Sequence, residues 1–339
     1  MNSNQTIRWS TAVEEADWIA ERLAPFDSGT VTSVVPEGLE AYARLLHPVH
    51  QGENLIRWAQ VAEWSQTPLS HDVQFHDIAL ARHSPTVPAP WDSPGPAQGT
   101  LHASDAVRLV SILREHTTTP RQCWFALWEG YGWDTATRFE LADEPRPARQ
   151  VESPIDPVPS EVRHGPRVEL PERSYLFYTG PIEAALSFIE EHEQTPNLWW
   201  PADRSWCVAS EIDLAWTYVA GTESLRDRML ADHALEALQV KPHEPMTFRL
   251  TGWLDDAVTA AATELLEHGS TQIRTAHRSL QASLQRPTRW RSGHLDIASH
   301  TDQGSSSTGT ETLFRKFGNV THQQLYRSLA QAVAELADL

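Results

Sequence analysis

The sequence predicts an α+β fold: an irregular mixed sheet with flanking helices, followed by a smaller, helix-rich C-terminal α+β domain. Segments with the two-residue period of strands are interleaved with segments that have the longer period of amphipathic helices. The strand-like segments are short, and proline-rich stretches of variable length separate them, which favours α+β over a regular parallel sheet. The chain of 339 residues is long enough for two domains.

Several segments have helical character. Thr11 and Glu14 have the spacing of a capping box, and Thr222 is suited to cap a later helix. Ala106, Leu109 and Leu113 fall on one apolar face. The predicted helices cover residues 10–23, 55–64, 105–116, 181–191, 222–231, 254–267, 271–285 and 321–339.

The strand signal comes from β-branched and aromatic runs. Residues 30–35 form a β-branched run that ends at Pro36, and residues 121–128 are apolar enough to be buried on both faces. The predicted strands cover residues 30–35, 42–47, 121–128, 167–170, 174–179, 206–212, 216–220 and 289–299.

The predicted domain boundary follows the sequence Pro-His-Glu-Pro at 242–245, after which the character of the chain changes. We therefore expect a tryptophan-rich, acidic domain over residues 1–245 and a helix-rich domain over 246–339. Residues 143–171 contain seven prolines and many charges, too little apolar surface for a core element. This segment is either an interdomain linker or an insertion, and the strands that follow it favour the insertion.

The charge is unevenly distributed. The formal net charge is −18, and residues 246–339 carry nine basic and nine acidic side chains, so the whole excess lies in residues 1–245. Such a surface repels phosphate groups, which argues against nucleic-acid and anionic-membrane partners. Five arginines between Arg274 and Arg291 leave two interpretations of the C-terminal part: a weak nucleic-acid contact or, as we favour, solvated arginines.

The sequence predicts a cytoplasmic protein. No run of eighteen apolar residues is present to span a membrane, and the N-terminus lacks the apolar stretch of a secretory signal. Cys123 and Cys207 each lie in an apolar, aromatic run, which is typical of small buried side chains on strands.

The motifs of several common enzyme classes are absent. The sequence has no GxxxxGK[ST] loop, no GxGxxG, no HExxH and no GxSxG. Two lysines, Lys241 and Lys316, leave little room for Schiff-base chemistry. We therefore expect no cofactor.

An aromatic set is the first candidate site. Trp128, Tyr131 and Trp133 lie on a glycine-containing loop near a strand end, and Trp199 and Trp200 come just before the turn that precedes the strand predicted over 206–212. Aromatic side chains of this kind form either a ligand-binding groove or a plug over the core.

The turn that follows Trp200 adds two residues to this candidate set. Asp203 and Arg204 lie in that turn, where they either contact a ligand or, for the aspartate, bond the backbone of its own turn.

Three carboxylates are candidates for catalysis. Glu129 follows the first aromatic strand, and Glu211 and Asp213 share one face at the end of another. Paired carboxylates act as general acid and base in hydrolysis. The same pattern is typical of a solvated strand end, which is the simpler interpretation.

His294, Asp296 and His300 are candidate metal ligands. Imidazole and carboxylate groups bind divalent metals, and positions 294 and 296 share one face of the predicted strand. A polar strand end that runs into a serine-rich loop has the same appearance, and we favour that interpretation.

The segments Cys123–Trp133, Asn197–Asp213 and Thr217–Gly221 resemble those of a family of uncharacterised actinobacterial proteins. The resemblance extends over about residues 25–245 and implies an actinobacterial, cytoplasmic origin. It implies no activity, ligand or catalytic residue.

Two functional hypotheses follow. The first is a non-catalytic binding protein, possessing an acidic surface and an aromatic groove, that acts in immunity or regulation by binding a basic protein such as a nuclease toxin, or a small ligand. The second is a hydrolase that uses Glu129, Glu211 or Asp213, or a metal at His294, Asp296 and His300.

Overall fold

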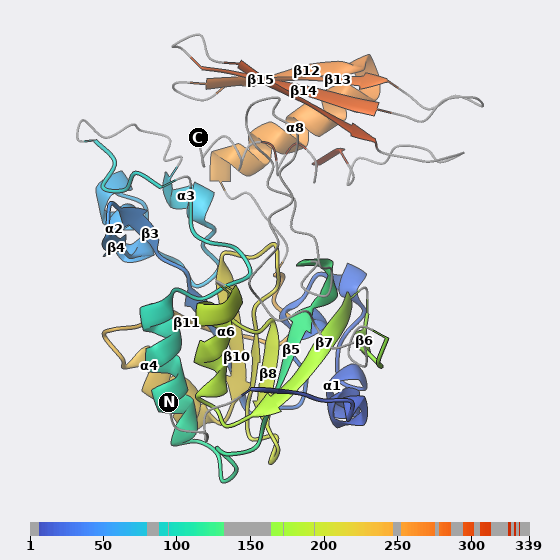
Figure 1. The fold of residues 1–339 in the computed structure, drawn as a ribbon. Coiled ribbons are helices and arrows are strands. Elements are labelled where there is room, and N and C mark those ends of the chain that lie inside the picture. Colours follow the sequence, from blue (N-terminus) through green and yellow to red (C-terminus); the bar gives the residue numbers. More distant parts are fainter. Residues whose placement is uncertain are drawn as a thin grey trace, which may run out of the picture. The chain divides into compact units, whose positions relative to one another are not determined.

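The computed structural model divides the chain into two compact units. The first is Met1–His47 with Ala97–Met246, and the second is Pro48–Pro96 with Thr247–Leu339 (Figure 1). The sequence prediction has no counterpart for the interruption of the first unit by residues 48–96. The structure describes residues 7–79, 88–93, 95–131, 164–171, 173–192, 194–246, 252–274, 278–285, 294–301 and 306–312, together with 325, 326, 329 and 332.

A nine-stranded sheet forms the centre of the first unit. Its strand order is β1-β7-β5-β8-β9-β10-β2-β11, with β6 beside β7, and every described pair is antiparallel. The predicted α+β class is therefore confirmed. The strands are β1 (Arg8–Trp9), β2 (Ala41–Leu46), β5 (Cys123–Trp128), β6 (Val168–Leu170), β7 (Arg173–Gly180), β8 (Leu198–Pro201), β9 (Cys207–Ala209), β10 (Trp216–Gly221) and β11 (Ala237–Val240).

Three helices cover one face of this sheet: α4 (Ala103–Arg114), α6 (Ala184–His192) and α7 (Glu223–Leu230). Figure 1 shows α4 and α6 lying across the strands. The core between them is aliphatic and aromatic, and it contains Leu109, Phe125, Phe188, Trp199, Val219 and Met229. The predicted Thr222 cap is confirmed, because its side chain accepts from the backbone N–H of Leu225.

The opposite face carries a second aromatic group. Phe177 stacks between Trp124 and Trp200, with ring centroids 5.4 and 5.7 Å away. Trp18, on the short helix α1 (Asp17–Ala20), meets Trp200 edge to face at 6.4 Å. Successive residues of a strand point to opposite faces, so the apolar run of β5 is buried on both sides.

The strand predicted over residues 30–35 is wrong. The structure has a 3-10 turn at Val31–Ser33, because the Thr30 and Ser33 side chains form a reciprocal capping box around it. The backbone N–H groups of Val31 and Thr32 find partners in the carbonyls of Glu244 and Pro242. Short hydroxyl side chains that bond the local backbone favour turns over strands.

Residues 48–96 contain a hairpin and two helices: β3 (Val49–Gln51), β4 (Asn54–Ile56), α2 (Trp58–Ser65) and α3 (Phe75–Ala79). Four aromatic rings hold this segment together. Trp58 packs on Phe75 at 5.4 Å, and Trp91 packs edge to face on Trp64 and Phe75.

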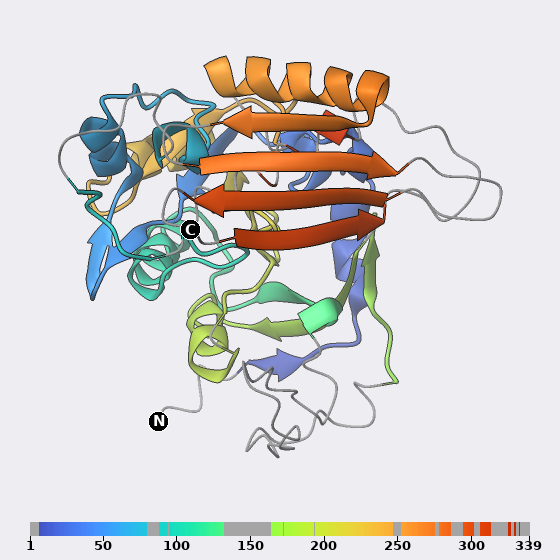
Figure 2. The same ribbon diagram turned by 90° about the horizontal axis from the view of Figure 1, so that it is seen from above.

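The C-terminal part pairs one helix with a four-stranded antiparallel sheet. The elements are α8 (Gly252–His268), β12 (Ser270–Arg274), β13 (Arg278–Gln285), β14 (His294–Thr301) and β15 (Ser306–Thr312). Figure 2 shows the strands in chain order with α8 along β12.

The helix predicted over residues 271–285 is wrong. Gly269, at φ 75°, ends α8, and the following core side chains alternate with the period of strands. Of the helix predicted over 321–339, residues 325, 326, 329 and 332 are described and helical, and Leu325 and Leu329 are buried.

Residues 132–163 lie outside the described residues. The strand before them is β5 and the strand after them is β6, and both pair with β7 in one sheet. Within the described part of the chain, no helix combines the length and apolar character needed to cross a membrane.

Candidate functional site

A row of polar side chains follows one end of the nine-stranded sheet. Because the strands are antiparallel, the ends of β5, β9 and β2 meet the beginnings of β7, β8 and β10 at this edge. The residues brought together here are Arg173, Trp128, Asn197, Ser210, Glu211, Thr217 and His47. We call this set the strand-end row.

Arg173 lies at one end of the strand-end row. Its guanidinium donates to the Glu211 carboxylate at 2.8 Å and packs over the rings of Phe26 and Trp128, at 5.0 and 5.5 Å from their centroids. Glu211 is 7% exposed. Burial raises the pKa of Glu211, although the hydrogen bond from Arg173 acts in the opposite direction.

A small crevice adjoins this ion pair. Its volume is about 20 Å³, and its polar lining consists of Ser33, Arg173, Asn197, Ser210 and Glu211. A cavity of this size holds a single water molecule. The crevice is therefore too small for an organic substrate.

Asn197 joins two strand ends in the middle of the row. Its side-chain oxygen accepts from the backbone N–H of Trp128 at 2.8 Å, and its amide nitrogen donates to the carbonyl of Ser210 at 3.0 Å. These bonds satisfy backbone groups that the short strands leave unpaired.

A buried hydroxyl chain continues from Ser210 to His47. Ser210 Oγ lies 2.7 Å from Thr217 Oγ1, which lies 2.9 Å from His47 Nε2. His47 Nδ1 lies 2.6 Å from the Ala97 carbonyl oxygen. All three side chains are at most 1% exposed.

The charge of the imidazole determines which groups donate and which accept hydrogen bonds from Ser210 to His47. Burial lowers the pKa of His47 to about 4, so the ring is neutral at pH 7. The Ala97 carbonyl only accepts, which assigns the proton to Nδ1 and the lone pair to Nε2. Thr217 then donates to His47, and Ser210 donates to Thr217. No local motif marks His47, Ser210 and Thr217, and sequence reasoning missed all three.

The structure gives each candidate catalytic carboxylate a cationic neighbour. Glu211 and Asp213 lie 2.8 and 3.8 Å from Arg173, and Asp213 is 77% exposed. Glu129 pairs instead with Arg167 at 3.2 Å. Trp128, Glu211 and Asp213 thus gather around one guanidinium, and Glu129 belongs to a different ion pair.

The candidate aromatic residues do not all face one groove. Trp199 and Trp200 are each 1% exposed and belong to the two opposite faces of the sheet. Trp128 is partly exposed over Arg173. The Tyr131 side chain and Trp133 lie outside the described residues.

The Asp203 carboxylate accepts hydrogen bonds both from its own turn and from residues 117–118. Its carboxylate accepts from the Thr117 and Thr118 hydroxyls, from the Thr118 backbone N–H, and from both N–H and hydroxyl of Ser205. Burial acts to raise the pKa of Asp203, but these hydrogen bonds outweigh it and lower the pKa to about 2. Arg204, at φ 57°, lies over the Trp18 ring at 5.7 Å.

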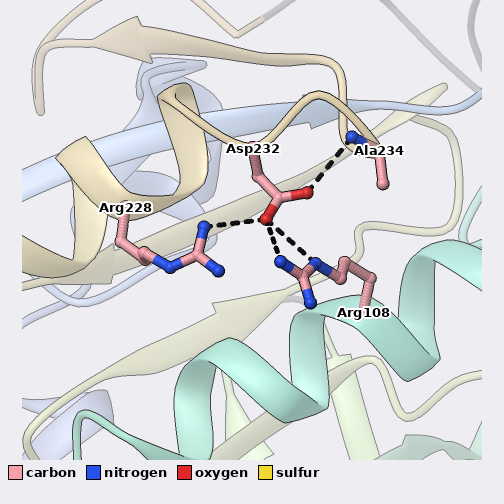
Figure 3. Close-up of polar contacts among 4 residues, drawn as sticks. All are labelled: Arg108, Arg228, Asp232 and Ala234. Atoms are coloured by element: carbon pink, nitrogen blue, oxygen red, sulfur yellow. Dashed lines mark hydrogen bonds and ion pairs between the residues drawn. The ribbon is translucent and has the colours of Figure 1, made fainter.

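Asp232 is a buried carboxylate that sequence reasoning missed. It accepts from Arg108 Nε and Nη2 at 2.9 and 2.5 Å, from Arg228 at 2.8 Å and from the Ala234 backbone N–H at 3.1 Å (Figure 3). The hydrogen bond from Arg108 is the main reason that the pKa of Asp232 lies far below its ordinary range. Asp232 is a structural link between α4 and α7.

The candidate metal ligands are only partly described. Asp296 lies on β14 and lines an open groove of about 690 Å³ together with Glu264 and polar residues of β12 and β13. The side chains of His294 and His300 lie outside the described residues. Among the described residues, no three histidine, cysteine or acidic side chains are grouped as metal ligands would be.

Fold and site together define an α+β protein with an antiparallel central sheet and a buried polar row along its strand ends. Comparisons of this chain with protein-family models, with curated proteins and with solved structures found no match. The resemblance to the actinobacterial family stays a prediction.

Proposed function

We propose that this chain is a non-catalytic binding protein whose first unit binds a basic protein partner through an acidic face. We define the acidic face as Glu14, Asp17 and Glu21. The three side chains are exposed, and none forms an ion pair with a described residue. Glu14 lies on the 3-10 turn Val13–Ala16, Asp17 begins α1 and Glu21 follows its last residue, so the three carboxylates belong to one short stretch of the chain.

Uncompensated surface carboxylates steer and bind a positively charged partner. They are part of the excess of acidic residues in 1–245, a charge that repels nucleic acid and anionic membranes. This is the charge pattern of an immunity or regulatory protein that neutralises a basic partner. A reducing compartment such as the cytoplasm suits its two free thiols, Cys123 and Cys207.

The hydrolase hypothesis has weaker support. Glu211 and Glu129 are occupied by arginines, which hold carboxylates in fixed positions, and the crevice beside Glu211 has room for one water molecule. Trp199 and Trp200 contribute to the core. The aromatic groove thus retains Trp128 alone among its described members.

The test compares two sets of carboxylates in the full chain. Glu14→Gln, Asp17→Asn and Glu21→Gln together neutralise the acidic face. The matched control, Glu223→Gln with Asp227→Asn, neutralises carboxylates on α7 that Arg226 already compensates. The partner is captured by cross-linking at about 50 mM salt, where charge interactions reach furthest, and its affinity is then measured.

We expect the acidic-face variant to lose at least tenfold in affinity, the control to bind as the wild type does, and binding to weaken as salt rises. Equal affinity of both variants and the wild type, or binding that is indifferent to salt, would contradict the proposal.

A further inference from the structure

The chain leaves the first unit after His47 and re-enters it at Ala97. These two residues mark the ends of the segment 48–96, and the structure places them in contact: His47 Nδ1 lies 2.6 Å from the carbonyl oxygen of Ala97. We call residues 47 and 97–99 the neck of this segment. The His47 side chain therefore links the residue just before segment 48–96 to the residue just after it.

Both sides of the neck also form backbone hydrogen bonds with the loop that precedes β10. The backbone N–H of His47 donates to Ala215, and that of Gly99 donates to Leu214, at 3.0 and 3.1 Å. Further along, Leu101 donates to the Thr195 hydroxyl at 3.1 Å. Residues 97–99 are thus bonded to His47 and Leu214, and the next hydrogen bond along the chain joins Leu101 to Thr195.

The His47 bond is suited to this task. The His47 side chain is fully buried whereas Ala97 is exposed, so the bond fixes an exposed piece of backbone to a donor that is itself shielded from water. Thr217 holds the other ring nitrogen at 2.9 Å and so fixes the orientation of the imidazole, while the Ala97 carbonyl, which only accepts, sets its tautomer.

We propose that the His47 imidazole is a clasp that closes the neck of segment 48–96. The clasp acts through its Nδ1–H donor to Ala97, so that loss of this donor loosens residues 97–101 while the central sheet stays closed. It is a conformational device within the first unit: it determines whether residues 97–101 are held beside the end of β2.

Two substitutions separate the two ring nitrogens. In His47→Asn the short side-chain amide replaces the Nδ1–H donor, and in His47→Gln the longer amide reaches toward Thr217 and leaves Ala97 without a donor. Hydrogen exchange of the full-length chain is measured for residues 97–101 and, as an internal reference, for β10.

His47→Gln is expected to raise exchange in residues 97–101 at least tenfold with no change in β10, and His47→Asn to keep exchange near that of the wild type. Exchange unchanged in His47→Gln, or raised in both variants alike, would overturn the clasp.

A measurement on the wild type keeps the proposal testable if His47→Gln does not fold. The ¹⁵N NMR signals of His47 are expected to show a protonated Nδ1 and an unprotonated Nε2 at pH 7. The opposite tautomer would leave no donor for Ala97 and would also overturn the proposal.

Discussion

Arg108 and Asp232 join two helices of the first unit: the guanidinium on α4 donates twice to the carboxylate that follows α7. Asp232 is 6% exposed and also accepts from Arg228 and from a backbone N–H. Removing a buried carboxylate with this many donors lowers the free energy of unfolding, because each donor loses a charged partner.

Asp232→Asn is therefore expected to lower the free energy of unfolding by about 2 kcal/mol, since hydrogen bonds to charged groups contribute more than neutral ones. Denaturant unfolding measures the change. Asp227→Asn, at an exposed residue of α7, is the control and is expected to change stability by less than about 0.5 kcal/mol. Equal effects of the two substitutions would refute the structural role of Asp232.

The Arg173–Glu211 pair makes a second stability prediction. Glu211→Gln removes the charge that the buried guanidinium faces, and breaking one partner of a buried pair costs about 3 kcal/mol. Asp213→Asn removes an exposed charge 3.8 Å from the same guanidinium and is expected to cost less than about 0.5 kcal/mol. Thermal unfolding of the two variants, measured in parallel, distinguishes a buried ion pair from a solvated cluster.

The strands with dense apolar runs were predictable from the sequence. β5, β7 and β10 each lie within two residues of the predicted bounds, because aromatic and β-branched residues bury well on both faces of a sheet. Residues 271–285 were mistaken for one helix because their core residues are few and divided between two strands, with Ile273 on β12 and Leu280, Ala282 and Leu284 on β13.

The strand-end row was harder to foresee. Glu211, Asp213 and Trp128 were singled out individually, but Arg173, which gathers them, lies in a different segment. His47 follows β2, Ser210 follows β9 and Thr217 lies on β10, and only the order of strands in the sheet brings them together. Sequence spacing carries no information on such long-range pairing.

The burial of Trp199 leads to a prediction that tests whether this residue belongs to the core or to a ligand-binding groove. Trp199 packs on Phe125 and Trp206 at 6.4 and 5.4 Å and is 1% exposed. Trp199→Ala is expected to destabilise the protein by about 4 kcal/mol, as large-to-small changes in a core do. Val107→Ala, at a residue 55% exposed, is expected to change stability by less than about 0.5 kcal/mol. A Trp199 variant of unchanged stability would return this residue to the ligand-binding candidates.

The buried imidazole of His47 predicts how stability depends on pH. Its pKa is lowered to about 4 by burial, and the hydrogen bond to the Ala97 carbonyl and the charge of Asp105 only partly offset this. Between pH 4 and the ordinary value of 6.5, the unfolded chain binds a proton that the folded chain does not. The contribution of His47 to the free energy of unfolding is therefore fully present above about pH 6.5 and is lost as the pH is lowered toward 4.

The expected loss is about 3 kcal/mol, the free energy that corresponds to a shift of this size. Denaturant unfolding between pH 7 and pH 4 measures it, and the difference between the wild type and His47→Asn isolates it, because other titrating groups contribute to both proteins. Since His47→Asn retains a donor for Ala97, the variant keeps the neck bond but has nothing to protonate. Its stability should vary less with pH in this window, and parallel pH profiles of the two proteins would show that His47 is not buried as a neutral ring.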